Sequence, residues 1–385
     1  MLSDFLKPLS FLLFSILPLT LHANSASTGH FKLALKPNIG VMKHFNAKDL
    51  CSVAKNTQQF INAHRDDNFA VHGGSVYDEE ITLERVTETL DFLCKVYRED
   101  ISNNGVSRLH DVEFISRHFD FYRWSPDINT AQSIAKKSTN KVKSRMLNAI
   151  PRDKIFLTKY YTKLLSASSV KTAEFNQALY QIPFDEMHLA LSDADKLKTE
   201  LTRFKFTRQQ VIAGALSAEN NQGKALAKPL VWISEEALHD VLLQGTGVLD
   251  VDGDIRYFNV HRNNGIPYDY AIGKREQARY WYFAEVKGIL GYGDEIDEKI
   301  AIKPQVTFAG NVKQLGLGKL FMVSYDIDGN AYSRLGVLAD QGGAFDNNLF
   351  QLDMLVDSYR GWRDYHQANK HLPDYSKAWL LLKKH

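Results

Sequence analysis

Two short apolar segments near the C-terminus, each carrying an aspartate, constrain the fold of this chain most. The first is Val337-Leu-Ala-Asp340, which runs into Gln-Gly342-Gly343-Ala344, and the second is Phe350-Gln-Leu-Asp353-Met-Leu355. Short apolar runs bounded by glycines predict buried β-strands joined through a turn. The chain is therefore expected to hold two carboxyl groups, thirteen residues apart, on strands connected by one glycine turn.

Asp353 is the first candidate for a catalytic group. It lies between Leu352 and Met354, so its strand should be largely buried. In a partly dehydrated cleft, the loss of hydration and the charge of Asp340 would both disfavour its ionised form. A carboxyl that stays protonated near neutral pH can act as a general acid. Two roles stay open for Asp340: capping the glycine turn, or orienting and tuning Asp353.

The size and charge of the chain exclude few folds but several functions. Its 385 residues are enough for two domains, and 47 basic side chains nearly balance 45 acidic ones. This balance gives no reason to expect a nucleic-acid partner. The sequence has no Gly-x-Ser-x-Gly elbow, phosphate-binding glycine loop or His-Glu-x-x-His pair, which disfavours a serine hydrolase, a nucleotide enzyme and a zinc peptidase. We expect no cofactor and no metal.

The N-terminus has the pattern of a secretory signal. A largely apolar run from Leu9 to Leu21 is too short to span a bilayer, and small residues follow it around 23–27. We predict a signal peptide over residues 1–26 and a periplasmic mature protein, with an uncleaved anchor as the alternative. No cysteine lies at the cleavage region, so a lipid anchor is not expected, and association with the outer membrane stays open.

Export bears on the two cysteines of the chain, Cys51 and Cys94. An oxidising compartment allows them to form a disulfide with a single possible connectivity. Two buried thiols are the alternative.

Local patterns divide the chain into helical and β-rich parts. Apolar residues spaced by three and four between Leu83 and Val96 predict an amphipathic helix, and a weaker helical pattern runs from Val112 to Phe121. Strand-forming residues dominate from about 154 onward, interrupted by helical segments with capping boxes at Ser192 and Thr207. This order favours an α+β fold in which one domain is inserted into another.

Five blocks, in this order, resemble the membrane-bound lytic murein transglycosylase A (MltA) family. They are Leu157-Thr-Lys-Tyr160-Tyr161-Thr162 with Tyr180-Gln-Ile-Pro183, Thr207 to Leu216, Leu243-Gln244-Gly245-Thr246-Gly247, Asn264-Gly-Ile-Pro-Tyr268 to Lys274, and Asp340 to Asp353. Lys159 replaces a glycine of the family pattern. Three aspartates give the family's barrel its name. Either Asp357 or Asp364 could be the third of them in this sequence.

The resemblance implies an α+β, mainly β fold with a double-psi β-barrel. The implied division is a helical N-terminal region over 27–153, a barrel from 154–183 and 300–385, and an inserted β-rich substrate-binding domain over 184–299. Family members cleave peptidoglycan glycan strands between N-acetylmuramic acid and N-acetylglucosamine and leave 1,6-anhydro ends. Peptidoglycan is thus the expected partner, and proteins of cell-wall or envelope complexes are possible further partners.

The implied site combines catalytic and binding residues. Asp353 would be the sole acid and base, with Asp340 beside it. The substrate would contact Tyr161, Gln244, Gly245, Gly247, Asn264, Tyr268, Gly342 and Gly343. Two other functions stay open: an inactive peptidoglycan-binding or scaffold protein of the same fold, and a glycoside hydrolase that uses water and a second carboxylate such as Asp357.

Overall fold

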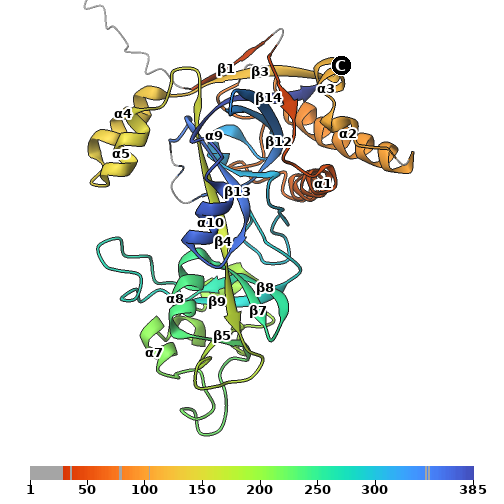
Figure 1. Cartoon of the computed structure of the whole chain (residues 1–385). Coiled ribbons are helices and arrows are strands. Elements are labelled where there is room, and N and C mark those ends of the chain that lie inside the picture. Colours follow the sequence, from red (N-terminus) through yellow and green to blue (C-terminus); the bar gives the residue numbers. More distant parts are fainter. Residues whose placement is uncertain (1–28, 35–36, 78–79, 104, 343–344, 346) are drawn as a thin grey trace, which may run out of the picture.

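A closed β-barrel forms the upper half of the molecule (Figure 1). The computed structural model describes residues 29–34, 37–77, 80–103, 105–342, 345 and 347–385. Within these residues six strands close the barrel, in the order β14-β11-β12-β10-β13-β4, because β4 pairs back onto β14. They are β4 (Ile155–Ala167), β10 (Thr307–Ala309), β11 (Leu320–Ile327), β12 (Asn330–Asp340), β13 (Gln351–Tyr359) and β14 (Tyr375–Lys383). The predicted α+β class with a barrel domain is confirmed.

The N-terminal region adds strands to this sheet as well as helices. β3 (Phe119–Ser125) pairs with β14, β1 (His30–Leu33) pairs with β3, and β2 (Val41–Met42) pairs with β12. The helix expected through Phe121 is wrong beyond its first half, since α3 (Val112–His118) ends where β3 begins. Phe119 and Phe121 alternate toward the core, and the free edge of β14 offers β3 the backbone partners of a sheet.

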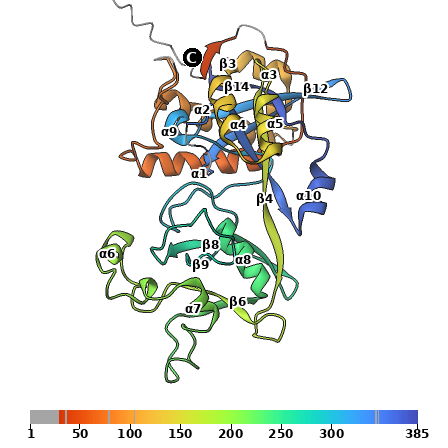
Figure 2. The ribbon, with the colours of Figure 1, turned by 90° about the vertical axis from the view of Figure 1, so that its left-hand side faces the viewer.

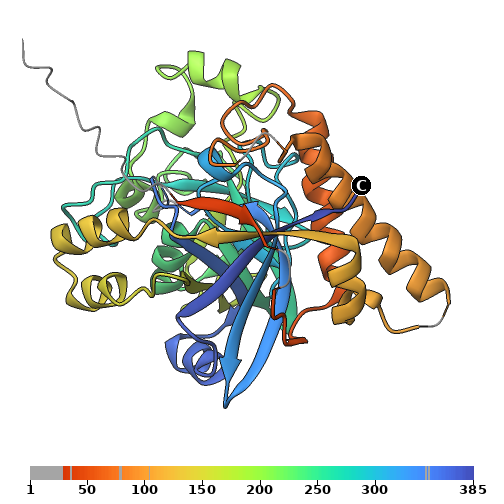
Figure 3. The same ribbon diagram turned by 90° about the horizontal axis from the view of Figure 1, so that it is seen from above.

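Helices cover the barrel on two sides (Figure 3). On one side lie α1 (Ala47–Ala63) and α2 (Leu83–Ser102), followed by the short turn η1 (Arg108–His110). On the other lie α4 (Ile128–Lys137) and α5 (Lys141–Asn148), which contain the basic run of the sequence. Cys51 of α1 and Cys94 of α2 form a disulfide.

One long strand, β4, joins the barrel to the second half of the molecule (Figure 2). Its residues 156–163 pair with β13 in the barrel, and residues 164–167 pair with β7 of the lower sheet. That sheet continues from β7 (Thr246–Val251) through β8 (Asp254–Asn263) to β9 (Trp281–Val286). The lower half has its own hydrophobic core around Leu249 and Phe258.

The remaining elements complete the two halves. The lower half also contains β5 (Gln177–Tyr180), β6 (Pro229–Ile233), α6 (Leu191–Lys196), η2 (Thr202–Phe204), α7 (Arg208–Ile212) and α8 (Glu235–Gln244). Two short helices, α9 (Val312–Leu315) and α10 (Trp362–Asn369), belong to the barrel half. No helix in the described ranges is long and apolar enough to cross a membrane. The predicted signal peptide lies outside the described residues.

Local sequence signals account for several of these boundaries. Thr207 and Gln210 form the expected capping box of α7, and Ser234 caps α8. The capping box expected at Ser192 is wrong, because α6 begins after Ala190 without any side-chain cap. Positive φ angles at Asp252-Gly253 and Asp328-Gly329 give the β7–β8 and β11–β12 hairpins their tight turns.

The disulfide between α1 and α2 should stabilise the helical layer over the barrel. It closes a loop of 43 residues, and a crosslink over such a loop restricts the unfolded chain. We expect Cys51→Ala with Cys94→Ala to lower the free energy of unfolding by about 2–5 kcal/mol. Urea unfolding measures this change, and reducing the wild-type protein should give the same shift. An unchanged midpoint in both experiments would contradict the prediction.

Candidate active site

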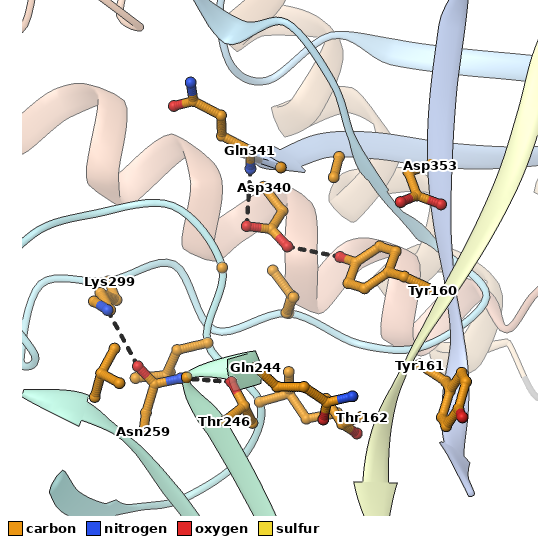
Figure 4. Close-up of a pocket in the computed structure, with 18 residues that line it drawn as sticks. Tyr160, Tyr161, Thr162, Gln244, Thr246, Asn259, Lys299, Asp340, Gln341 and Asp353 are labelled. Carbon is orange, nitrogen blue, oxygen red and sulfur yellow. Dashed lines mark hydrogen bonds between the residues drawn. The ribbon is translucent and has the colours of Figure 1, made fainter. Parts of the chain in front are cut away.

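A cavity of about 420 Å³ lies where the barrel meets the lower half of the molecule (Figure 4). Strands of the barrel provide its carboxyl and tyrosine side chains, and the end of α8 with the start of β7 provides its opposite wall. The lining residues used below are Tyr160, Tyr161, Gln244, Gly245, Thr246, Asn259, Lys299, Asp340, Gly342 and Asp353.

Asp353 reaches this cavity from the middle of the barrel sheet. Its strand, β13, runs between β4 and β10, so Asp353 is in register with Thr158 on one side and Ala309 on the other. The neighbouring Leu352 and Met354 are fully buried, which fixes the direction of Asp353 because side chains alternate along a strand. Its Oδ1 is buried and has no hydrogen-bond partner among the described residues.

The surroundings of Asp353 favour its protonated form. Burial raises the pKa of Asp353 to about 7, and the negative charge of Asp340 acts in the same direction. The hydroxyl of Thr158 and the positive charge of Lys159 act against this shift. Asp353 can therefore carry a proton near neutral pH, as a general acid requires.

Asp340, at the end of β12, is held by two hydrogen bonds that stabilise its ionised form. The hydroxyl of Tyr160 donates to Oδ2 at 2.7 Å, and the backbone N–H of Gln341 donates to Oδ1 at 2.8 Å. Burial raises the pKa of Asp340 to about 6, while these two hydrogen bonds and the charge of Lys299 lower it. Asp340 is thus the first of the pair to ionise, and its charge keeps the proton on Asp353.

The wall opposite the two aspartates is polar and internally hydrogen-bonded. Gln244 Oε1 accepts a hydrogen bond from the backbone N–H of Lys163 at 3.0 Å. Asn259 joins its neighbours, since its amide donates to the Thr246 hydroxyl at 2.9 Å and its Oδ1 accepts from Lys299 Nζ at 3.1 Å. Sequence reasoning missed Asn259 and Lys299, because neither lies in a recognisable motif and only the folding of distant segments brings them here.

The end of α8 shapes this wall. Gly245 takes a left-handed conformation with φ of 76°, which ends the helix and turns the chain directly into β7. Gln244 and Thr246 flank this turn and both line the cavity. Gly245 in the block Leu243 to Gly247 is therefore explained by the backbone turn that ends α8, and residues of the same block line the cavity.

Tyrosine side chains extend the cavity along β4 toward α10. Tyr161 stacks on Tyr365 with ring centroids 4.6 Å apart and meets the edge of Tyr359 at 5.7 Å. The pair Tyr160 and Tyr161 points to opposite sides of its strand, so one ring serves Asp340 and the other joins the aromatic cluster (Figure 4).

The structure brings together six of the ten predicted catalytic and substrate-binding residues. These are Asp353, Asp340, Tyr161, Gln244, Gly245 and Gly342, which all line the cavity. Gly343 lies outside the described residues.

The other three predicted binding residues do not line the cavity. Asn264 is 2% exposed, and its side-chain amide donates to the carbonyls of Phe206 and Ala278. Tyr268 packs against Tyr270, and Gly247 is buried at the start of β7. Asn264 thus braces a loop of the lower half.

Neither candidate for the third aspartate lies in this cavity. Asp357 is exposed at the far end of β13, and Asp364 is exposed on α10. The strand that carries Asp353 has already left the cavity at Asp357.

Residues 156–279 match a family model described as the MltA-specific insert domain. A membrane-bound lytic murein transglycosylase from Agrobacterium tumefaciens has a similar structure, with a TM-score of 0.52 and 15% identity over 87% of this chain and 93% of that one. MltA from Neisseria gonorrhoeae gives a TM-score of 0.52 and 14% identity over 93% and 92%.

A third structure, Escherichia coli MltA with bound chitohexaose, gives a TM-score of 0.50 and 15% identity over 92% of this chain and 95% of that one. The comparison with curated protein sequences gives no match. The resemblance to the MltA family seen in the sequence is confirmed by the insert-domain match and by the shared fold.

The raised pKa of Asp353 makes a stability prediction with a definite sign. An aspartate in the unfolded chain has a pKa of about 3.9, whereas burial raises that of Asp353 to about 7. Between these values the folded protein keeps a proton that the unfolded chain loses, so the free energy of unfolding falls as pH rises. The Asp353→Asn variant has no such proton to lose, so its stability should not fall in this way as pH rises. We expect the variant to be more stable than wild type by about 1–3 kcal/mol at pH 8.

Urea unfolding at pH 4, 6 and 8 measures this difference, which should shrink toward zero at pH 4. Asp364→Asn, which changes an exposed aspartate, should keep the wild-type pH dependence. Parallel pH dependences for wild type and Asp353→Asn would contradict the burial of Asp353.

Proposed function

We propose that this protein, which has the insert domain and the fold of MltA lytic transglycosylases, cleaves the β-1,4 bond between N-acetylmuramic acid and N-acetylglucosamine in peptidoglycan. The reaction would leave 1,6-anhydro ends. The observation that carries the proposal is Asp353, a buried carboxyl with a pKa of about 7 in a cavity between two domains, beside an aspartate that ionises first.

One carboxyl group suffices for this reaction. Asp353 donates its proton to the glycosidic oxygen as the bond to C1 breaks, and the C6 hydroxyl of the same muramic acid residue attacks C1. The resulting carboxylate of Asp353 accepts the proton of that hydroxyl, which restores the starting state. Because the nucleophile is part of the substrate, it is present at high effective concentration and no second carboxylate has to activate water.

Asp340 acts as a positioning residue in this scheme. Its two oxygens are engaged by Tyr160 and by the backbone of Gln341 at normal hydrogen-bond distances of 2.7 and 2.8 Å. An aspartate held in this way is poorly placed to activate water, but its charge raises the pKa of Asp353. This arrangement favours the transglycosylase over a hydrolase with two working carboxylates.

The cavity suits a glycan strand. A groove between domains allows a polymer to contact polar side chains on one wall and aromatic rings on the other. Here Gln244, Asn259 and Lys299 form the polar wall, and Tyr161 provides a ring. Escherichia coli MltA has been solved with bound chitohexaose, a sugar oligomer, which supports glycan binding in a protein of this fold.

The proposed setting is the periplasm, reached through the signal peptide predicted over residues 1–26. Peptidoglycan is the proposed partner. Contacts with proteins of cell-wall or envelope complexes stay a prediction. A pull-down with the N-terminal helical region tests it.

Loss of the proposed acid should abolish product formation. General acid and base catalysis contributes roughly 10²- to 10⁴-fold to a rate, so Asp353→Asn should lower the release of anhydro-muropeptides from sacculi by at least this lower figure. Mass analysis of the released muropeptides measures it. Asp364→Asn, an exposed aspartate on α10, is the matched control and should keep wild-type activity.

The same assay separates the other functions. Products with reducing ends would indicate a hydrolase, and binding to sacculi without release would indicate a scaffold. If Asp353→Asn still forms anhydro products at the wild-type rate, Asp353 is not the acid.

Tyr160→Phe tests the coupling between the two aspartates. Without the Tyr160 hydroxyl, Asp340 keeps its proton to a higher pH, so its negative charge no longer raises the pKa of Asp353. We expect the alkaline limb of the pH–rate profile to move to lower pH by roughly half a unit to one unit. Tyr375→Phe, which removes a hydroxyl that donates to Met146 O at 2.8 Å, should keep the wild-type profile. An unmoved limb in Tyr160→Phe would show that Asp340 does not tune Asp353.

A further inference from the structure

A second cavity, of about 470 Å³, opens at the end of the barrel beyond Asp353. The start of α1, the residues before β10, the end of β13 and the segment after α10 surround it. Figure 3 shows α10 and the hairpin of β11 and β12 on the same side of the molecule. Three basic side chains, Arg334, His44 and His371, line this cavity, and the proposed reaction uses none of them.

Arg334 is a buried charge with no acidic partner among the described residues. It lies on β12 and is 2% exposed. Its Nε donates to the Tyr325 hydroxyl at 3.0 Å and its Nη1 to Gln305 Oε1 at 2.5 Å, and both acceptors are neutral. Arg334 forms no salt bridge with any described residue. The equally buried Arg203, by contrast, forms a salt bridge with Glu186 at 2.9 Å.

A buried guanidinium without a counter-ion is costly, because burial removes the water that would stabilise its charge. Arg334 keeps this charge, since arginine is not deprotonated in proteins. Its position in the wall of an open cavity allows an anion from solution to supply the missing partner. A carboxylate is the usual planar partner of the guanidinium fork.

The two histidines face the same space. Partial loss of hydration lowers the pKa of His44, and the positive charges of Arg334 and His371 lower it further, which places all three groups within electrostatic range of one another. Asp49 and Asp357 also line the cavity and carry the opposite charge. A ligand that fits this cavity must therefore place a carboxylate next to the basic side chains. It must also accommodate the acidic groups at the rim, and a peptide with an ammonium group can form ion pairs with them.

The two cavities are neighbours along one strand. Tyr359 lines the second cavity, and its ring contacts that of Tyr161, which lines the first, at 5.7 Å. From Asp353 to Asp357, β13 advances four residues, or about 13 Å. An extended peptide of four residues spans about the same length.

We propose that this cavity binds a carboxylate of the stem peptide that muramic acid carries, with Arg334 as the buried anchor and His44 and His371 beside it. The assignment of the peptide to peptidoglycan rests on the proposed function. The carboxylate site itself rests on the geometry of Arg334. A stem peptide held here would set which muramic acid residue lies over Asp353.

Peptide binding without cleavage tests the proposal. Two probes are titrated into the full-length purified protein by calorimetry: a synthetic stem tetrapeptide with free carboxylates, and the same peptide with its carboxylates amidated. The free peptide should bind at least about tenfold more tightly, the ratio expected for a charge-assisted hydrogen bond. Arg334→Gln should remove this difference.

A surface variant keeps the test decisive if Arg334→Gln does not fold. His44→Gln with His371→Gln changes two exposed side chains and should reduce the preference for the free peptide. Lys370→Gln removes an exposed charge next to His371 but outside the cavity, and should bind both peptides as wild type does. Binding by wild type should tighten as pH falls from 7 to 5, because the lowered pKa of His44 moves the gain of its proton below the usual range of a histidine.

Three results would overturn the proposal: equal affinity for the two peptides, unchanged binding in the double-histidine variant, or acetate binding as tightly as the tetrapeptide. The titration needs no cleavage. Peptide binding by a protein that forms no anhydro product would leave this site standing and remove only the proposed reaction.

Discussion

The pairing of β4 with β13 is the constraint on which the site depends. Among the described residues, β4 is the one strand that belongs to both halves of the molecule, since its first part pairs with β13 and its last four residues pair with β7. The same strand carries Tyr160 and Tyr161, and its partner carries Asp353. A slip of one residue in this register would turn Asp353 into the core and Met354 toward the cavity.

Hydrogen bonding is what separates the two buried aspartates chemically. Both have raised pKa values because water has little access to them, but only Asp340 has a tyrosine hydroxyl and a backbone N–H to stabilise its charge. Asp353 keeps a buried oxygen without a described hydrogen-bond partner. One fold thus makes one carboxyl group a fixed charge and the other a proton carrier, through hydrogen bonding rather than through residue type.

Arg334 extends the same principle to the other end of the barrel. The interior of a barrel is an expensive place for a charge, and Arg334 is satisfied there by neutral acceptors only. Its presence is difficult to explain by stability alone. Tyr359, which lines the second cavity, contacts Tyr161, which lines the first, so the two cavities are neighbours.

Sequence patterns are enough to predict the strands around Asp340 and Asp353, the capped start of α7, the glycine end of α8 and the order of blocks that resembles the MltA family. These features depend on neighbours within a few residues, so local spacing reveals them. It could not separate Gln244, which lines the cavity, from Asn264, which braces a loop, because both are amides in similar turn motifs. Three further features became visible only in the folded protein: β3 adds to the sheet, Asn259 and Lys299 face the aspartates, and Arg334 lines a second cavity. Each of these depends on backbone or side-chain partners far away in the sequence, and no local pattern encodes such partners.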